Sequence, residues 1–163
     1  MRLQAHIILL HSHSLQAQLD GAEAIPFDPA ICLAEAKKYA VQGDIGAVFS
    51  FYSGLEILTQ AWQERLRQSP VNIIWSGALR ALARYLIERY WLQAVSDYDL
   101  ICRVKLIISA CLLVGAMGGD PVGTAQLYSK EIENDPDNVE AILDGAYASP
   151  ALTDANLLGL LLA

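Results

Sequence analysis

The densest group of polar side chains lies in the last third of the chain, in the run YSKEIENDPDNVE. A phenol, an ammonium group, carboxylates and a carboxamide in one short segment could form the polar rim of a cleft. We therefore predict that Tyr128, Lys130, Glu131 and Asn138 bind a substrate or a partner. The alternative interpretation is structural, because charged helix faces are usually just solvated: Tyr128 then lies in the core, Lys130 and Glu133 face solvent, and Asn138 helps to cap a helix.

Other motifs typical of catalysis do not occur in the sequence. It contains no G-x-S-x-G nucleophile motif, no phosphate-binding P-loop and no G-x-G-x-x-G fingerprint. Gly115, Gly118 and Gly119 do not follow a strand-like segment, which argues against a nucleotide site there. We therefore assign no catalytic residue.

The histidines and cysteines have the wrong spacing for a metal site. His6 and His13 are seven residues apart, whereas metal ligands on one helix are usually three or four apart. Cys102 and Cys111 are nine apart, on opposite sides of a helix, and Cys32 stands alone. We predict exposed histidines, buried thiols in a reducing compartment, no metal in this chain and a cytoplasmic location.

Bulk composition excludes some classes of partner. The net charge is −7 and no run of Lys and Arg occurs, which argues against binding to nucleic acid. The hydrophobic fraction is 54% and the mean hydropathy is +0.32, which indicates a large core or an apolar surface for a partner. The apolar run Leu106–Met117 is shorter than the about 20 residues that a membrane span needs. We predict one domain, residues 1–163, with no membrane span.

Helical periodicity runs through almost the whole chain, and no strand-like alternation is present. The pattern predicts an all-α bundle of about eight helices, over residues 2–19, 29–43, 44–68, 79–95, 99–116, 121–133, 137–149 and 154–162. Residues 22–28, which include Pro26, form a loop. The helix 99–116 is apolar on all sides, so we place it at the centre of the bundle.

Local signals fix several of these boundaries. Asp28-Pro29 and Asp120-Pro121 combine an N-cap with a proline at the first helical position. Gly118-Gly119 closes the central helix, residues 137–140 resemble a capping box, and Thr153 caps the last helix. The segment 44–68 carries an apolar stripe at helical spacing: Val48, Phe51, Leu55, Leu58, Trp62 and Leu66. The stripe of 121–133 comprises Val122, Ala125, Tyr128 and Ile132, and spacing predicts the ion pairs Arg84–Glu88 and Asp99–Arg103.

Three stretches of the sequence resemble a known family. They are Leu55-Glu56-Ile57-Leu58 followed by Trp62 and Leu66; the run YLIERYWL at 85–92; and the segment from Arg103-Val104-Lys105-Leu106 through LYSKEIE to Asn138-Val139-Glu140-Ala141. They resemble the C-terminal helical portion of flagellin lysine-N-methylase-like proteins, which are similar to the broader cysteine-cluster (CxxCxxCC) proteins. The likeness covers most of residues 50–162.

The resemblance implies methyl transfer from S-adenosylmethionine to lysine ε-amines of a bacterial surface protein such as flagellin. It also implies an N-terminal cysteine cluster that binds iron–sulfur or zinc, and this sequence has no such cluster. We therefore expect the C-terminal part of a longer protein, which scaffolds the cluster domain or binds substrate and is not catalytic alone. Its expected partners are the cysteine-cluster domain of the same polypeptide, a protein substrate and a second copy of itself.

Two other functions remain open. The high apolar fraction also fits a stand-alone helical module for protein interaction or dimerisation. A ligand-binding helical domain of a regulator is a third possibility, but the sequence has no basic recognition helix to accompany it.

Overall fold

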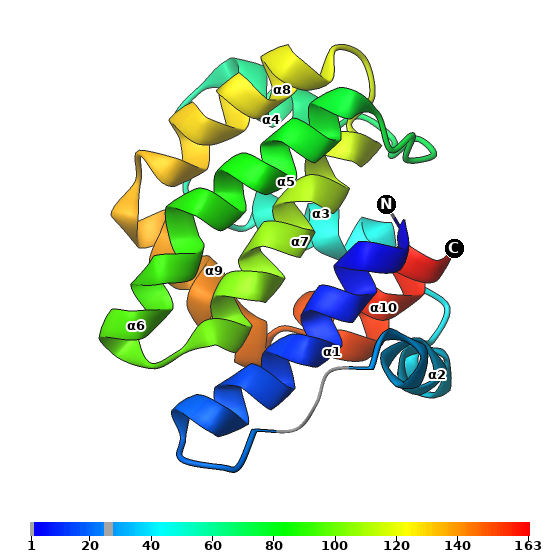
Figure 1. Ribbon diagram of the computed structural model, residues 1–163. Coiled ribbons are helices and arrows are strands. Elements are labelled where there is room, and N and C mark those ends of the chain that lie inside the picture. Colours follow the sequence, from blue (N-terminus) through cyan, green and yellow to red (C-terminus); the bar gives the residue numbers. More distant parts are fainter. Residues whose placement is uncertain (1, 25–27) are drawn as a thin grey trace.

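The computed structural model describes residues 2–24 and 28–163, with side chains from residue 9 onward. These residues form an all-helical bundle without strands (Figure 1), which confirms the predicted all-α fold. Pro26, in the expected loop, lies outside the described residues. No helix in the described ranges has both the length and the apolar character needed to cross a membrane.

The described residues form ten α-helices and three short helical turns of other kinds. The helices are α1 (Arg2–Leu19), α2 (Pro29–Tyr39), α3 (Ile45–Ser53), α4 (Gln60–Leu66), α5 (Gly77–Tyr90), α6 (Ala94–Asp97), α7 (Leu100–Ala116), α8 (Pro121–Tyr128), α9 (Pro136–Ala148) and α10 (Asp154–Leu162). A 3₁₀ turn, Trp91–Gln93, joins α5 to α6, a π-helical turn, Ser129–Glu133, follows α8, and a second 3₁₀ turn, Pro150–Leu152, precedes α10.

Helix α7 is the centre of the bundle, as predicted. It packs against α1, α3, α5, α8 and α9, which surround it in Figure 1. Leu106, Leu112 and Leu113 are completely buried. Each such side chain contributes about 1.5–3 kcal/mol through the removal of apolar surface from water.

The predicted helix caps are largely confirmed. The side chains of Asp28, Asp120 and Thr153 accept hydrogen bonds from backbone N–H groups in the first turns of α2, α8 and α10. Gly118, which follows α7, has φ of +67°, a left-handed conformation that favours glycine. The predicted capping box at 137–140 is wrong, because Asp135 caps α9 two residues earlier.

The single helix expected over 44–68 is wrong. Helix α3 ends at Ser53 and α4 begins at Gln60, so residues 54–59 form a connecting loop. Leu58, assigned to the buried stripe, is 49% exposed. The loop persists because the side chains of Glu131 and Asn138, distant in the sequence, hold its backbone.

The region between α5 and α7 also differs from expectation. Helix α5 ends at Tyr90, before the predicted end near Val95. Buried Arg103 pairs with Asp97 and donates to Gln93 Oε1 at 2.9 Å, whereas Asp99, its expected partner, caps α7. The other predicted pair, Arg84–Glu88, is present with an N–O distance of 2.7 Å.

Candidate functional site

The π-helical turn Ser129–Glu133 organises the polar segment that the sequence singles out. A π turn contains an extra residue per turn, so it rotates the following side chains relative to a regular α-helix. Here Glu131, Ile132 and Glu133 are all buried. The expectation that Glu133 faces solvent is therefore wrong: only 1% of its side chain is exposed. The predicted stripe is also wrong at Val122, in the first turn of α8, which is 53% exposed.

Glu131 holds the end of the loop that leads into α4, whose N-cap is Thr59. Its Oε2 accepts hydrogen bonds from the backbone N–H groups of Leu58 at 2.9 Å and Thr59 at 3.3 Å. These groups precede α4, whose N-terminus attracts negative charge. The carboxylate thus fixes the backbone just before α4, where sequence periodicity predicts a continuous helix.

Asn138 fixes the same loop from α9. Its Oδ1 accepts from the N–H of Glu56 at 2.9 Å, while its Nδ2 donates to the carbonyls of Glu56 at 2.9 Å and Glu131 at 3.0 Å. The residue is 2% exposed. One carboxamide therefore joins the 54–59 loop to the π turn.

Glu133 ties the π turn to α5. Its Oε1 lies 2.9 Å from Arg89 Nε and accepts from the hydroxyls of Tyr85 at 3.2 Å and Tyr90 at 3.3 Å. Burial, together with this carboxylate, raises the pKa of Tyr90 to about 12 against the opposing effect of Arg89. Both phenols therefore remain neutral donors near neutral pH.

Tyr128 and Lys130 complete the set of predicted binding residues. Tyr128 is fully buried, with its ring centroid 6.2 Å from that of Tyr52 and 6.1 Å from that of Trp62. Lys130 is exposed. Substrate binding by Tyr128, Lys130, Glu131 and Asn138 stays a prediction, but Tyr128, Glu131 and Asn138 are buried inside the protein.

The motif stretches that carry the family resemblance meet at this junction. The 55–58 stretch is held by Glu131 and Asn138, and the 85–92 stretch by Glu133. Stretches that are far apart in the sequence are thus parts of one hydrogen-bonded unit.

The described residues do not suit the metal cluster that the resemblance implies. They contain no group of three His, Cys, Asp or Glu side chains placed to hold a metal ion. Cys102 and Cys111 are buried within α7, and burial raises the pKa of each thiol to about 12, which disfavours the thiolate that a metal requires. Cys32 is partly buried on α2, away from both in sequence.

The composition predicts an apolar surface but does not indicate which residues form it. In the structure such a surface lies at the C-terminal end of α1. A hollow of about 290 Å³ is lined by Leu15, Gln18, Leu19, Trp91, Leu92, Ala94, Val95 and Leu100. A second, of about 430 Å³, adds Ile87 and Glu88 and shares Trp91 and Leu92. We name these residues the α1–α6 surface; its helices lie on the same side of the molecule in Figure 1.

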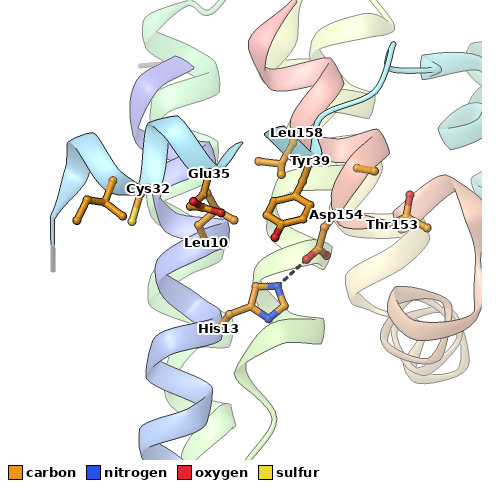
Figure 2. Close-up of a pocket in the computed structure, with 10 residues that line it drawn as sticks. Leu10, His13, Cys32, Glu35, Tyr39, Thr153, Asp154 and Leu158 are labelled. Carbon is orange, nitrogen blue, oxygen red and sulfur yellow. Dashed lines mark hydrogen bonds and ion pairs between the residues drawn. The ribbon is translucent and has the colours of Figure 1, made fainter. Parts of the chain in front are cut away.

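A third hollow, of about 590 Å³, lies between α1, α2 and α10 (Figure 2). At its edge His13 Nε2 is 2.6 Å from Asp154 Oδ2, and Lys105 Nζ from α7 is 2.8 Å from Asp154 Oδ1. Burial raises the pKa of Asp154, but its two basic neighbours outweigh this effect and lower it to about 2. Sequence spacing could not reveal this pairing, because His13 and Asp154 are 141 residues apart. The side chain of His6 lies outside the described part of the chain.

No protein-family model, curated protein or solved structure matches this chain. The family resemblance therefore rests on the quoted motifs alone.

Proposed function

We propose that this chain is a helical protein-binding domain that docks another folded unit on the α1–α6 surface. The observation that carries the proposal is the exposure of neighbouring large apolar side chains: Leu92 is 72% exposed and Val95 is 65% exposed, beside partly exposed Trp91. Contiguous apolar surface of this kind commonly marks a protein interaction site. Tryptophan is also enriched among the residues that contribute most to such interfaces.

The backbone next to this surface gives further support. Tyr98 has φ of +58°, a left-handed conformation that costs about 1–2 kcal/mol for a residue with a side chain. Gln16 holds this turn, since its side chain donates to the Tyr98 carbonyl at 2.6 Å and accepts from Leu100 N–H at 2.7 Å. The phenol is 64% exposed, so a strained turn presents an aromatic ring to solvent. Strain of this kind is often kept where a residue has a role in recognition.

The resemblance suggests what is docked. On this proposal the partner is the cysteine-cluster domain of an S-adenosylmethionine-dependent protein lysine N-methylase, and this chain scaffolds it and helps to hold the protein substrate. The metal ligands and the methyl-donor site then belong to the partner domain. Support comes from the motif stretches, which form one connected unit.

The alternative occupant is a second copy of this chain. The same apolar surface favours it, because two copies can bury Trp91 and Leu92 against each other without any other protein.

The experiment begins with the gene upstream of Met1. If an in-frame cysteine-rich segment is encoded there, that segment and this chain are produced separately and their affinity is measured by calorimetry. Leu92→Asp should weaken binding by about 30-fold or more, because burying an unpaired charge costs at least about 2 kcal/mol. Ile74→Asp is the matched control: Ile74 is 80% exposed, in the segment between α4 and α5.

Sedimentation of the chain alone separates the two occupants. A dimer that Leu92→Asp dissociates would establish the second copy in place of the cluster domain. A monomer that also fails to bind the cysteine-rich segment would refute docking at this surface.

A further inference from the structure

The segment between α5 and α7, residues 91–98, supplies much of the α1–α6 surface. Trp91 and Leu92 line both of its hollows, and Ala94 and Val95 line one of them. The segment consists of a 3₁₀ turn and α6, which is a single helical turn. Isolated helices shorter than about 12 residues are unstable in water, so side chains outside the segment must help to fix its conformation.

The two ends of this segment are held by such side chains. At its beginning, buried Glu133 accepts a hydrogen bond at 3.3 Å from the hydroxyl of Tyr90, the last residue of α5. At its end, Gln16 donates to the Tyr98 carbonyl at 2.6 Å and accepts from the N–H of Leu100 at 2.7 Å. Helix α6 lies between these two anchors, so its orientation depends on further contacts.

Arg103, on α7, supplies a contact to both ends of α6. Its guanidinium donates to Gln93 Oε1 at 2.9 Å and pairs with the carboxylate of Asp97. Gln93 precedes α6 and Asp97 is its last residue, so one planar, forked cation spans the whole turn. Burial raises the pKa of Asp97, but the hydrogen bonds from Arg103 and from the Asp99 backbone outweigh this effect and lower it.

Fold stability alone does not explain an arginine at this position. Arg103 is 7% exposed, in a helix that is otherwise largely apolar. Its Nε is buried without a hydrogen-bond partner in the described part of the chain. Removal of a charge from water is costly, and apolar side chains that replace a buried ion pair are often as stabilising or more so.

We propose that Arg103 is a positioning residue that holds α6 so that Leu92 and Val95 are presented together to the docking partner. The inference rests on the proposed docking function, and it adds a residue that the partner does not contact, because Arg103 lines neither hollow. A surface that is fixed before binding loses less conformational entropy when the partner docks. The arginine therefore raises the affinity for the partner through α6.

Arg103→Met tests this role, because it removes both contacts and keeps an unbranched apolar side chain in the core. Hydrogen exchange of the full chain is measured by NMR. Exchange at the amides of residues 93–98 should accelerate by about tenfold or more, as expected for the loss of hydrogen bonds to a charged group. The amides of residues 106–113, in the centre of α7, should keep their rates. Tm should change by less than about 4 °C, because both released partners reach water: Gln93 is exposed and the Asp97 side chain is 42% exposed.

Three further variants make the result specific. Arg103→Lys keeps the charge without the planar fork, so it should restore part of the protection from exchange. Gln93→Ala combined with Asp97→Ala breaks the same contacts from exposed positions, so it should reproduce the acceleration even if Arg103→Met does not fold. Arg67→Met is the matched control: Arg67 is exposed at the end of α4, and its replacement should change neither exchange at 93–98 nor Tm.

Binding measurements separate this inference from the docking function. If the wild-type chain binds a cysteine-rich segment or a second copy, Arg103→Met should weaken that binding by about tenfold and Arg67→Met should not. If the wild-type chain binds neither, docking is refuted, and the exchange rates still decide whether Arg103 fixes α6. Unchanged exchange at 93–98 in both Arg103→Met and the double variant, or equal acceleration throughout α7, would overturn the proposal.

Discussion

Replacing Asn138 by alanine should destabilise the fold, because this carboxamide joins α9 and the π turn to the 54–59 loop. The change removes one hydrogen bond accepted from Glu56 N–H and two donated to the carbonyls of Glu56 and Glu131. Each is worth about 1 kcal/mol net, so the three together contribute about 3 kcal/mol. The two hydrogen bonds to Glu56 contribute less than this average, since that residue is exposed and water can replace them. The hydrogen bond to the Glu131 carbonyl is buried and contributes more than the average.

Thermal unfolding followed by circular dichroism measures this effect. For a domain of this size each kcal/mol shifts Tm by about 2–4 °C, so Asn138→Ala should lower Tm by about 6–12 °C. Hydrogen exchange should also accelerate at the amides of Glu56, Leu58 and Thr59. Asn134→Ala is the control: Asn134 is exposed, four residues before Asn138, and should shift Tm by less than about 2 °C.

The refuting result is equal unfolding temperatures for the two variants. Asn138 would then not hold the loop, and its predicted role in binding a substrate would be favoured over the structural role described above.

Three further predictions follow from particular residues. Folding lowers the pKa of Asp154 from 3.8 to about 2, so the ionised carboxylate stabilises the fold by on the order of 2 kcal/mol. This contribution is complete above about pH 4 and is lost between about pH 4 and pH 2. Asp154→Asn should remove this acid dependence from urea unfolding curves. Tyr98→Gly should raise the free energy of unfolding by up to about 1 kcal/mol in urea denaturation, since it relieves the left-handed strain. Gly159→Ala should lower Tm by several degrees in calorimetry, because its Cβ would clash with the Val41 carbonyl oxygen. Gly77→Ala is the control, because its Cβ meets open space and should leave Tm unchanged.

Helix ends that depend on local chemistry could be predicted from the sequence. Asp28, Asp120 and Thr153 cap helices through backbone groups within three residues, so the signal lies in adjacent letters. The central position of α7 could also be predicted, because a helix without a polar face must be enclosed.

Features that depend on distant partners could not be predicted. The break between α3 and α4 is held by Glu131 and Asn138, more than 70 residues away, so the regular apolar stripe of 44–68 is misleading. The π turn changes which side Glu133 faces, and helical periodicity assumes that no such turn occurs. The pairing of His13 with Asp154 joins the two ends of the chain, which no spacing rule connects.

The docking proposal is tested most directly by sedimentation velocity on an equimolar mixture of this chain and a cysteine-rich segment, if sequencing of the gene finds one in frame upstream of Met1. The account predicts one complex that Leu92→Asp dissociates and Ile74→Asp leaves intact. If neither Leu92→Asp nor Ile74→Asp changes the sedimentation profile, docking on the α1–α6 surface is contradicted. This holds whether or not the two polypeptides form a complex.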